Sequence, residues 1–165
     1  MVKLLILGHS RHGKDTVAQY FSHKGLCYTS SSMYLCENYI YPLMKNTFNY
    51  SSPLDCYNDR HNHRDYWYQI ICDYNKYDPS RLAKEILKTN DIYVGMRDER
   101  EVLSCINQRL FDLIIWVERN IPTESSSSFN VDKSLADIII DNNSSLEHLK
   151  HKVYRLANTF HLHLY

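Results

Sequence analysis

Nine consecutive residues near the start of the chain combine glycines, a lysine and side chains that can bind a phosphate or a metal ion. The stretch Gly-His-Ser-Arg-His-Gly-Lys-Asp-Thr, residues 8–16, has the spacing G-x-x-x-x-G-K. In this spacing the glycines let the backbone wrap around a phosphate, and successive amide groups donate hydrogen bonds to it. We expect Lys14 to bridge the β- and γ-phosphates of a nucleoside triphosphate, so the pattern predicts phosphoryl transfer. The expected nucleotide-binding residues here are Gly8, His9, Ser10, Arg11, His12, Gly13, Lys14, Asp15 and Thr16.

Asp15 occupies the position at which a serine or threonine hydroxyl usually binds Mg²⁺. A carboxylate there can bind Mg²⁺ directly or through water, and it can also take a proton from an attacking alcohol. We therefore expect ATP and Mg²⁺ as cofactors, Lys14 and Asp15 as catalytic residues, and Asp15 as the metal ligand. The sequence leaves open whether Asp15 is base, ligand or both, or only stabilises the start of the following helix.

The residues around this loop predict a strand before it and a helix after it. Residues 2–7 form an apolar run typical of a strand buried on both faces, and Val17, Tyr20 and Phe21 follow at a helical spacing. Further strands are predicted near residues 26–29, 92–97, 111–117 and 138–140, with helical patterns between them. We therefore expect an α/β fold, a three-layer doubly wound parallel sheet of the P-loop kinase type, with residues 1–165 as a single domain.

Proline and serine positions predict where three helices begin or end. Pro42 is expected to end the helix that follows the second strand. Asp78 and Pro79 are expected to open a helix as its N-cap and first residue. Ser144 and Glu147 have the spacing of a capping box and are expected to open the last helix.

Composition excludes several classes of protein. Lysine and arginine total 19 against 19 aspartate and glutamate, so net charge gives no sign of a general nucleic-acid binder. No apolar run approaches the ~20 residues that span a bilayer, and the N-terminus lacks the features of a signal peptide. We therefore expect a cytoplasmic protein that does not bind membranes, located in the host cytoplasm if the protein is viral. The oligomeric state is not indicated.

Two later segments, together with the loop, carry a resemblance to a known family. The chain resembles the P-loop nucleoside and deoxynucleoside monophosphate kinases, which are thymidylate kinase-like, and its Gly-Lys-Asp-Thr sequence is similar to that of phage deoxynucleotide kinases. Residues 94–101 are similar to the G-x-R-x-x-x-E segment at a strand end in that family, and residues 136–143 resemble its segment near the adenine. The resemblance implies that Arg97 is catalytic and reaches the acceptor or the transferred phosphate, and that Asn142 borders the adenine.

The expected lid-like loop, about residues 119–133, departs from that family. Its members often bring several arginines over the phosphates, whereas Arg119 is the only arginine in this segment. We expect the missing charge to come from an acceptor-binding segment at about residues 45–80, in which basic and aromatic side chains interleave around residues 60–68. The expected substrate-binding residues are Arg60, Arg64, Arg97 and Arg119.

Three functions remain open, and they differ in the acceptor. In the first, the chain phosphorylates the hydroxymethyl group of 5-hydroxymethyluracil in phage DNA, as in the kinases of thymidine hypermodification that it resembles; an alcohol benefits from a base such as Asp15. In the second, the acceptor is a free deoxynucleoside monophosphate, whose oxygen is already anionic. In the third, the chain is a non-catalytic nucleotide-binding module. The arginine-poor lid and the basic-aromatic segment favour the first, whereas the zero net charge disfavours it.

Overall fold

The computed structural model describes residues 2–123 and 129–160. In this part of the chain five parallel strands form one sheet in the order β2-β3-β1-β4-β5. The strands are β1 (Leu4–Leu7), β2 (Tyr28–Ser30), β3 (Ile92–Val94), β4 (Leu113–Glu118) and β5 (Ile138–Asp141). The predicted parallel α/β sheet is confirmed. Because β1 lies at the centre, with β3 on one side and β4 on the other, the strand order reverses beside it, which is where ligands bind in open sheets.

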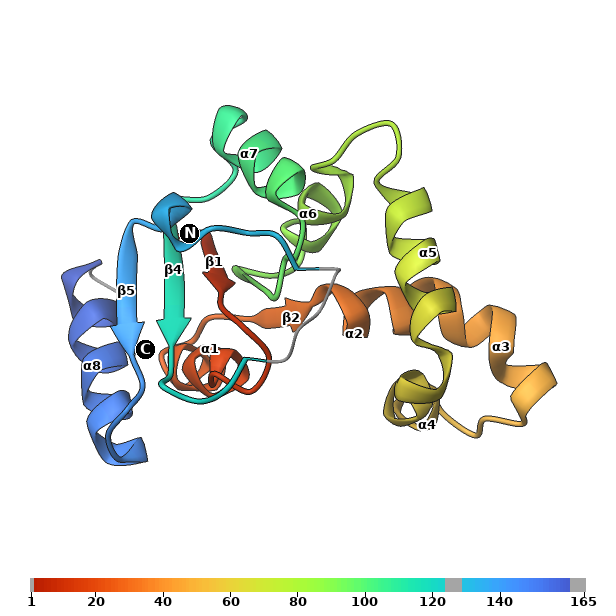
Figure 1. Ribbon diagram of the computed structural model, residues 1–165, viewed down its shortest axis with the longest axis horizontal. Coiled ribbons are helices and arrows are strands. Elements are labelled where there is room, and N and C mark those ends of the chain that lie inside the picture. The colour runs from red at the N-terminus through yellow and green to blue at the C-terminus, as the bar shows by residue number, and fades with distance from the viewer. Residues whose placement is uncertain (1, 124–128, 161–165) are drawn as a thin grey trace.

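Helices cover both faces of the sheet (Figure 1). On one face lie α1 (Lys14–Ser22) and α8 (Leu146–Thr159); on the other lie α2 (Ser31–Leu35), α6 (Arg81–Ile86) and α7 (Glu99–Asn107). Successive side chains of a strand point to opposite faces, so Leu4 and Ile6 pack with α1 and α8 while Leu5 and Leu7 pack with the other layer. Both faces of β1 are therefore buried, which explains its continuous apolar run.

A helical arm extends from the second layer beyond the β2 edge of the sheet (Figure 1). It contains the π-helical segment Cys36–Ile40, α3 (Tyr41–Phe48), α4 (Pro53–Asn58), the 3₁₀ turn Asp59–His63 and α5 (Arg64–Tyr74). Trp67 of α5 is buried in the same core as Leu5 and Leu7. The arm is therefore anchored to the sheet through α5. A short 3₁₀ turn, Lys133–Leu135, precedes β5.

The prediction that Pro42 ends a helix is wrong. The helical backbone runs on from the π-helical segment Cys36–Ile40 into α3, with Pro42 in its first turn. In the π turn the Tyr41 N–H donates to the Cys36 carbonyl, five residues back. This wider turn and the position of Pro42 at the start of α3 leave room for the proline ring. They also tolerate its lack of a backbone N–H, which would break the interior of a regular helix.

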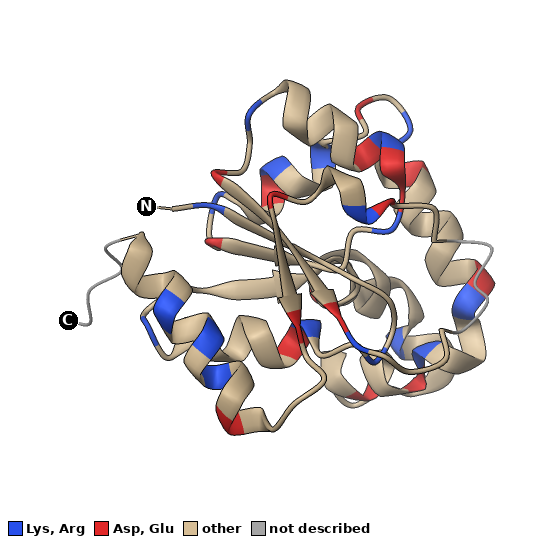
Figure 2. Cartoon of the chain, turned by 60° about the vertical axis from the view of Figure 1, so that its left-hand side comes forward, with Lys and Arg blue, Asp and Glu red and all other residues tan. Residues whose placement is uncertain are grey.

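Charged side chains are spread over the helices on both sides of the sheet. Figure 2 shows lysine and arginine positions interspersed with aspartate and glutamate positions along these helices. Of the helices described, none is long and apolar enough to cross a bilayer.

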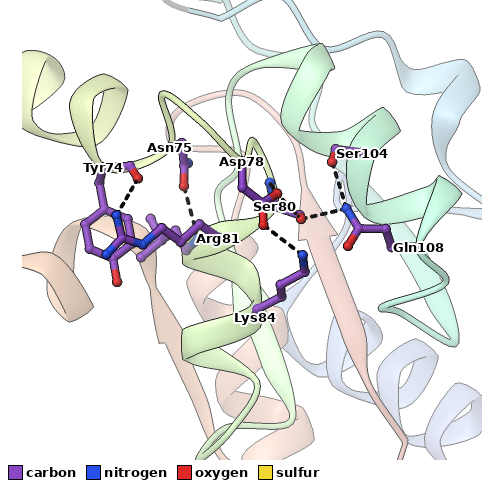
Figure 3. Close-up of polar contacts among 9 residues, drawn as sticks. Tyr74, Asn75, Asp78, Ser80, Arg81, Lys84, Ser104 and Gln108 are labelled. Carbon is purple, nitrogen blue, oxygen red and sulfur yellow. Dashed lines mark hydrogen bonds and ion pairs between the residues drawn. The ribbon is translucent and has the colours of Figure 1, made fainter.

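The N-terminus of α6 lies two residues beyond the predicted position. The helix begins at Arg81, because the Asp78 carboxylate accepts hydrogen bonds from the backbone N (3.0 Å) and Oγ (2.6 Å) of Ser80 and so closes a turn before it (Figure 3). Asp78 also pairs with Lys84 at 2.8 Å. Pro79 therefore lies in this turn and not in the helix.

The cap of α8 is displaced by one residue from the predicted capping box. Ser145, not Ser144, has the extended backbone of an N-cap, and its Oγ accepts from the His148 N–H at 3.2 Å. Glu147 is thereby moved out of the position that would complete the box. Ser144 is left in the connection after β5, where it becomes available to the site described below.

Substitution of Gly8 tests the packing beneath the loop that follows β1, and Gly25, which follows α1, provides the comparison. Gly8 has φ +140°, and a methyl group there would overlap the backbone carbonyl of Val117 in β4. Gly25 has φ +87°, but a methyl group there would meet no atom within 4 Å. We expect Gly8→Ala to lower the free energy of unfolding by about 3 kcal/mol or more, because strain and overlap add.

The matched variant Gly25→Ala should lower the free energy of unfolding by only about 1 kcal/mol, the cost of the backbone conformation alone. Urea denaturation of both variants measures the difference. Equal losses in the two would contradict the packing described for Gly8.

Candidate functional site

The loop between β1 and α1 wraps around a space at the carboxyl end of the sheet. Gly13 has φ +98° and forms the N-cap of α1. The Asn142 side chain, which follows β5, packs directly against Gly13 and donates a hydrogen bond from Nδ2 to the His12 carbonyl at 2.9 Å. Asn142 thus holds the loop from its far side, which adds a structural role to the adenine contact implied for it.

Lys14 lies across this loop. Its ammonium group donates to the His9 carbonyl at 2.7 Å. Burial lowers the pKa of Lys14 to about 8; Asp15 opposes this shift and Arg97 adds to it. The side chain therefore stays mainly cationic at neutral pH, and it lies close enough to Arg97 for the two charges to interact.

Two histidines of the loop connect it to the predicted lid. His12 is buried, and its Nδ1 accepts from the backbone N–H of Arg119 at 3.1 Å. Burial and the neighbouring His9 lower the pKa of His12, so it is neutral at pH 7. The His9 ring contacts Trp116 and Phe129, with ring centroids 5.5 and 4.7 Å away. The two described ends of the lid-like segment are therefore packed on the loop, while residues 124–128 lie outside the described part of the chain.

The larger cavity opens above the loop and has a volume of about 340 Å³. It is lined by Arg11, Gly13, Lys14, Asp15, Thr16, Arg119, Asn142, Ser144 and Leu146. The volume lies within the ~300–1,000 Å³ typical of ligand sites, and the lining joins anion-binding groups to one apolar side chain. We call it the nucleotide cavity, after the ligand that the sequence of the loop predicts.

The groups around Asp15 fit the ion that the motif implies. Mg²⁺ is usually held by one or two carboxylates together with phosphate oxygens and waters. Asp15 is exposed and lines the nucleotide cavity beside Lys14 and Thr16. The carboxylate at the end of β4, Glu118, instead pairs with Lys133 at 2.8 Å. Asp15 is thus the carboxylate placed to meet a metal ion on the phosphates.

A second, narrower cavity of about 80 Å³ lies between β3, α5 and α7. Its lining includes Tyr68, Tyr93, Arg97, Asp98 and Glu101. Gly95 also lines it, and a methyl group at Gly95 would meet Lys14 Cε at 3.9 Å. Lys14 therefore stands between the two cavities. We call the second one the acceptor cavity, because Arg97, which the resemblance places at the acceptor, lines it.

Acidic groups outnumber cations in the acceptor cavity. Asp98 is paired with Arg100 at 2.8 Å and caps α7. Glu101 is only 9% exposed, and its Oε1 accepts from Asn75 Nδ2 at 2.6 Å. Burial raises the pKa of Glu101 to about 7. Arg97 is the one cation in the described lining, so the cavity is poorly suited to a doubly charged anion.

The structure separates the four arginines predicted to bind substrate. Arg97 lines the acceptor cavity, whereas Arg119 lines the nucleotide cavity. Arg60 donates to the Tyr57 carbonyl at 2.8 Å and lies over the Tyr57 ring, outside both linings. Arg64 is also outside them, but it lies four residues before Tyr68 on α5 and so on the same helix face, one turn beyond the cavity.

Several residues of the site were not identified from the sequence. Tyr68 and Cys72 line the acceptor cavity, and Asn75 holds Glu101 from the end of α5. Their spacing on α5 follows one helix face, but nothing local indicates what that face meets. Ser144 and Leu146 line the nucleotide cavity because α8 begins one residue later than predicted.

The raised pKa of Glu101 predicts a specific effect of pH on stability. Because the folded-state pKa is about 7 against an ordinary value of 4.5, this group stabilises the fold below pH 4.5, and that contribution is lost as pH rises to about 7. The loss amounts to about 3 kcal/mol. We expect Glu101→Gln, which keeps the hydrogen bond from Asn75, to be more stable than the parent at pH 8 and similar to it at pH 4.5.

Thermal unfolding at pH 4.5, 6 and 8 measures this effect. A stability difference between the two proteins that did not change with pH would show that Glu101 titrates normally in the fold.

Comparison with known proteins identifies the fold. No protein-family model and no curated protein sequence matches this chain. Among solved structures, a shikimate kinase from Bacteroides thetaiotaomicron is similar, with 8% identity, a TM-score of 0.53, and coverage of 97% of this chain and 98% of that one. A shikimate kinase from Aquifex aeolicus is similar at 11% identity and a TM-score of 0.52, with 96% and 98% covered. The five-stranded parallel sheet of this chain is therefore that of the P-loop kinase fold.

Proposed function

We propose that this protein is an ATP-dependent kinase that transfers the γ-phosphoryl group from the nucleotide cavity to a hydroxyl group in the acceptor cavity. The observation that carries the proposal is the position of Lys14, which lines the first cavity and borders the second at Gly95. A nucleotide whose phosphates lie in the loop would place its last phosphate beside this lysine, facing the acceptor.

The residues around the loop have distinct roles in this reaction. Loop amides and Lys14 bind the phosphates, and Arg97 and Arg119 supply further positive charge from the two sides. The acceptor oxygen forms a bond to the γ-phosphorus as the bond to the β-phosphate oxygen breaks, leaving ADP. Asp15 takes the proton that the acceptor hydroxyl loses. Mg²⁺, when bound at Asp15, neutralises charge on the phosphates.

The charge of the acceptor cavity supports a neutral acceptor. A monophosphate brings two negative charges. Asp98 is already paired with Arg100, so Glu101 is the acidic group that would oppose these charges, and Arg97 is the one cation of the described lining that would attract them. A hydroxymethyl group on a heterocyclic ring brings none. The small volume, about 80 Å³, suits one ring or side group and not a whole nucleotide. We therefore place the hydroxymethyl group of 5-hydroxymethyluracil in phage DNA first among acceptors.

A base within DNA must leave its stack to enter such a cavity. Enzymes that act on bases swing the nucleotide out of the helix and hold it between apolar and aromatic side chains. Tyr68 at the rim and Tyr93 in the wall provide such surfaces. Arg64, one turn beyond Tyr68, is suitably placed for a flanking phosphate of the same strand. The position of Arg97 in the lining favours the alternative acceptor, a deoxynucleoside monophosphate, because its positive charge attracts a phosphate.

Transfer of labelled phosphate distinguishes the acceptors. We expect γ-labelled ATP to label DNA that contains 5-hydroxymethyluracil and not free deoxynucleoside monophosphates. Lys14→Ala should reduce this labelling by at least ~10³-fold without unfolding the protein, because the main cation on the phosphates is lost. Lys24→Ala is the matched control, since Lys24 lies over the Tyr154 ring and lines neither cavity.

Label in a free diphosphate would make the protein a monophosphate kinase. No label in any acceptor, with ATP bound, would favour a nucleotide-binding module without catalysis.

Asp15→Asn tests the base role separately. An amide cannot take a proton, so we expect turnover to fall by at least ~10²-fold while the dissociation constant for ATP changes little. The measurement is single-turnover transfer over a range of Mg²⁺ concentrations. Full recovery of turnover at high Mg²⁺ would show that Asp15 only binds the metal and would contradict its role as a base.

A further inference from the structure

We infer that Glu101 is the specificity-determining residue of the acceptor cavity, and that its carboxylate accepts a hydrogen bond from the N3–H of a uracil ring. This inference rests on the proposed function and deepens it, since it names the chemical group by which the acceptor base is recognised. Glu101 lines the acceptor cavity from α7, and Gly95, which borders Lys14, lines the same cavity.

One oxygen of Glu101 is occupied and the other is available. Oε1 accepts from Asn75 Nδ2 at 2.6 Å. Within residues 2–123 and 129–160 no further hydrogen bond to this carboxyl group is found, and the side chain lines the cavity. A carboxylate accepts several hydrogen bonds, so the second oxygen can receive an N–H from a ligand.

Asn75 fixes the orientation of this carboxylate. It is buried at the end of α5, and its own Oδ1 accepts from the Leu82 N–H at 3.0 Å. The short connection around it is closed by the Asp78 contacts, and Arg81 lies over the Tyr74 ring (Figure 3). These contacts do not involve the phosphate-binding loop. The carboxylate is therefore held in place before any ligand binds, as a specificity determinant requires.

The surroundings of Glu101 explain why a donor on the ligand matters. Tyr93 and Ile71 contribute to the cavity wall, and Glu101 itself is 9% exposed. A buried carboxylate without a second partner loses its hydration, and burial raises its pKa to about 7. A ring N–H would replace the lost water. A ring without that hydrogen would leave the charge unpaired, and such mismatches are what allow strong discrimination.

Binding of three single-stranded oligonucleotides at pH 8 tests the inference. Each carries one modified base: 5-hydroxymethyluracil, its N3-methyl derivative, or 5-hydroxymethylcytosine, whose N3 is an acceptor. We expect the parent protein to bind the first at least ~10-fold more tightly than the other two.

E101Q should reverse part of this order. Its amide oxygen keeps the bond from Asn75, so its amide N–H groups face the cavity and repel N3–H while donating to the cytosine N3. We expect E101Q to lose ~10-fold affinity for the uracil oligonucleotide and to bind the cytosine one more tightly than the parent does. E99Q is the matched control, because it removes the same charge from the first turn of α7 and Glu99 does not line the cavity.

The outcomes separate the inference from the proposed function. If the parent binds the uracil and N3-methyl oligonucleotides equally, or if E101Q discriminates between them as the parent does, Glu101 does not read N3–H. Labelling of the uracil oligonucleotide by γ-labelled ATP, measured on the same samples, would then still support the kinase. If the parent neither binds nor labels any of the three but labels a free monophosphate, both the inference and the DNA acceptor are overturned. The comparison of the three oligonucleotides on the parent protein does not depend on whether a variant folds.

Discussion

The loop that follows β1 can take its shape only because two positions in it have no side chain. Gly8 lies against the backbone carbonyl of Val117, and Gly13 against the side chain of Asn142, at approaches that a methyl group would prevent. These contacts fix the loop to β4 and to the end of β5. The Asn142 hydrogen bond to the His12 carbonyl then sets the direction of the amides that follow. Lys14, the first residue of α1, takes its position from this packing.

Positive charge reaches the site from separate parts of the fold. Lys14 belongs to the loop and α1, Arg97 follows β3, and Arg119 follows β4. The ends of parallel strands meet at one edge of the sheet, so these cations converge although they are far apart in the sequence. Arg119 is also tied to the loop through its backbone contact with His12. The shortage of arginines in the lid-like segment therefore does not leave the phosphate side without charge.

The acceptor cavity, in contrast, is lined by more acidic groups than cations. Its lining includes residues of α5, α7 and β3, and it contains a buried carboxylate held by Asn75. Such a group is destabilising in its charged form when it lacks partners. A cavity with aromatic walls and a fixed acceptor oxygen is better matched to a neutral polar ring than to a phosphate.

The sequence by itself determined the pattern of the loop and the parallel α/β sheet, because those depend on short-range spacing. Residues 8–16 carry their chemistry in nine adjacent positions, and the apolar run before them is typical of a strand buried on both faces. Local patterns failed where a neighbouring turn overrode them: Pro42 is accommodated by the π turn, and Ser145 takes the cap expected of Ser144.

Only the tertiary structure decided the acceptor side. Arg60 and Arg64 stand out in the sequence by their charge, yet neither lines the nucleotide cavity or the acceptor cavity, and Arg60 lies on Tyr57. Tyr68 and Glu101 line the same cavity although they belong to α5 and α7, and Asn75, which follows α5, binds Glu101. Their partnership depends on contacts between residues up to 33 positions apart, which no local spacing encodes.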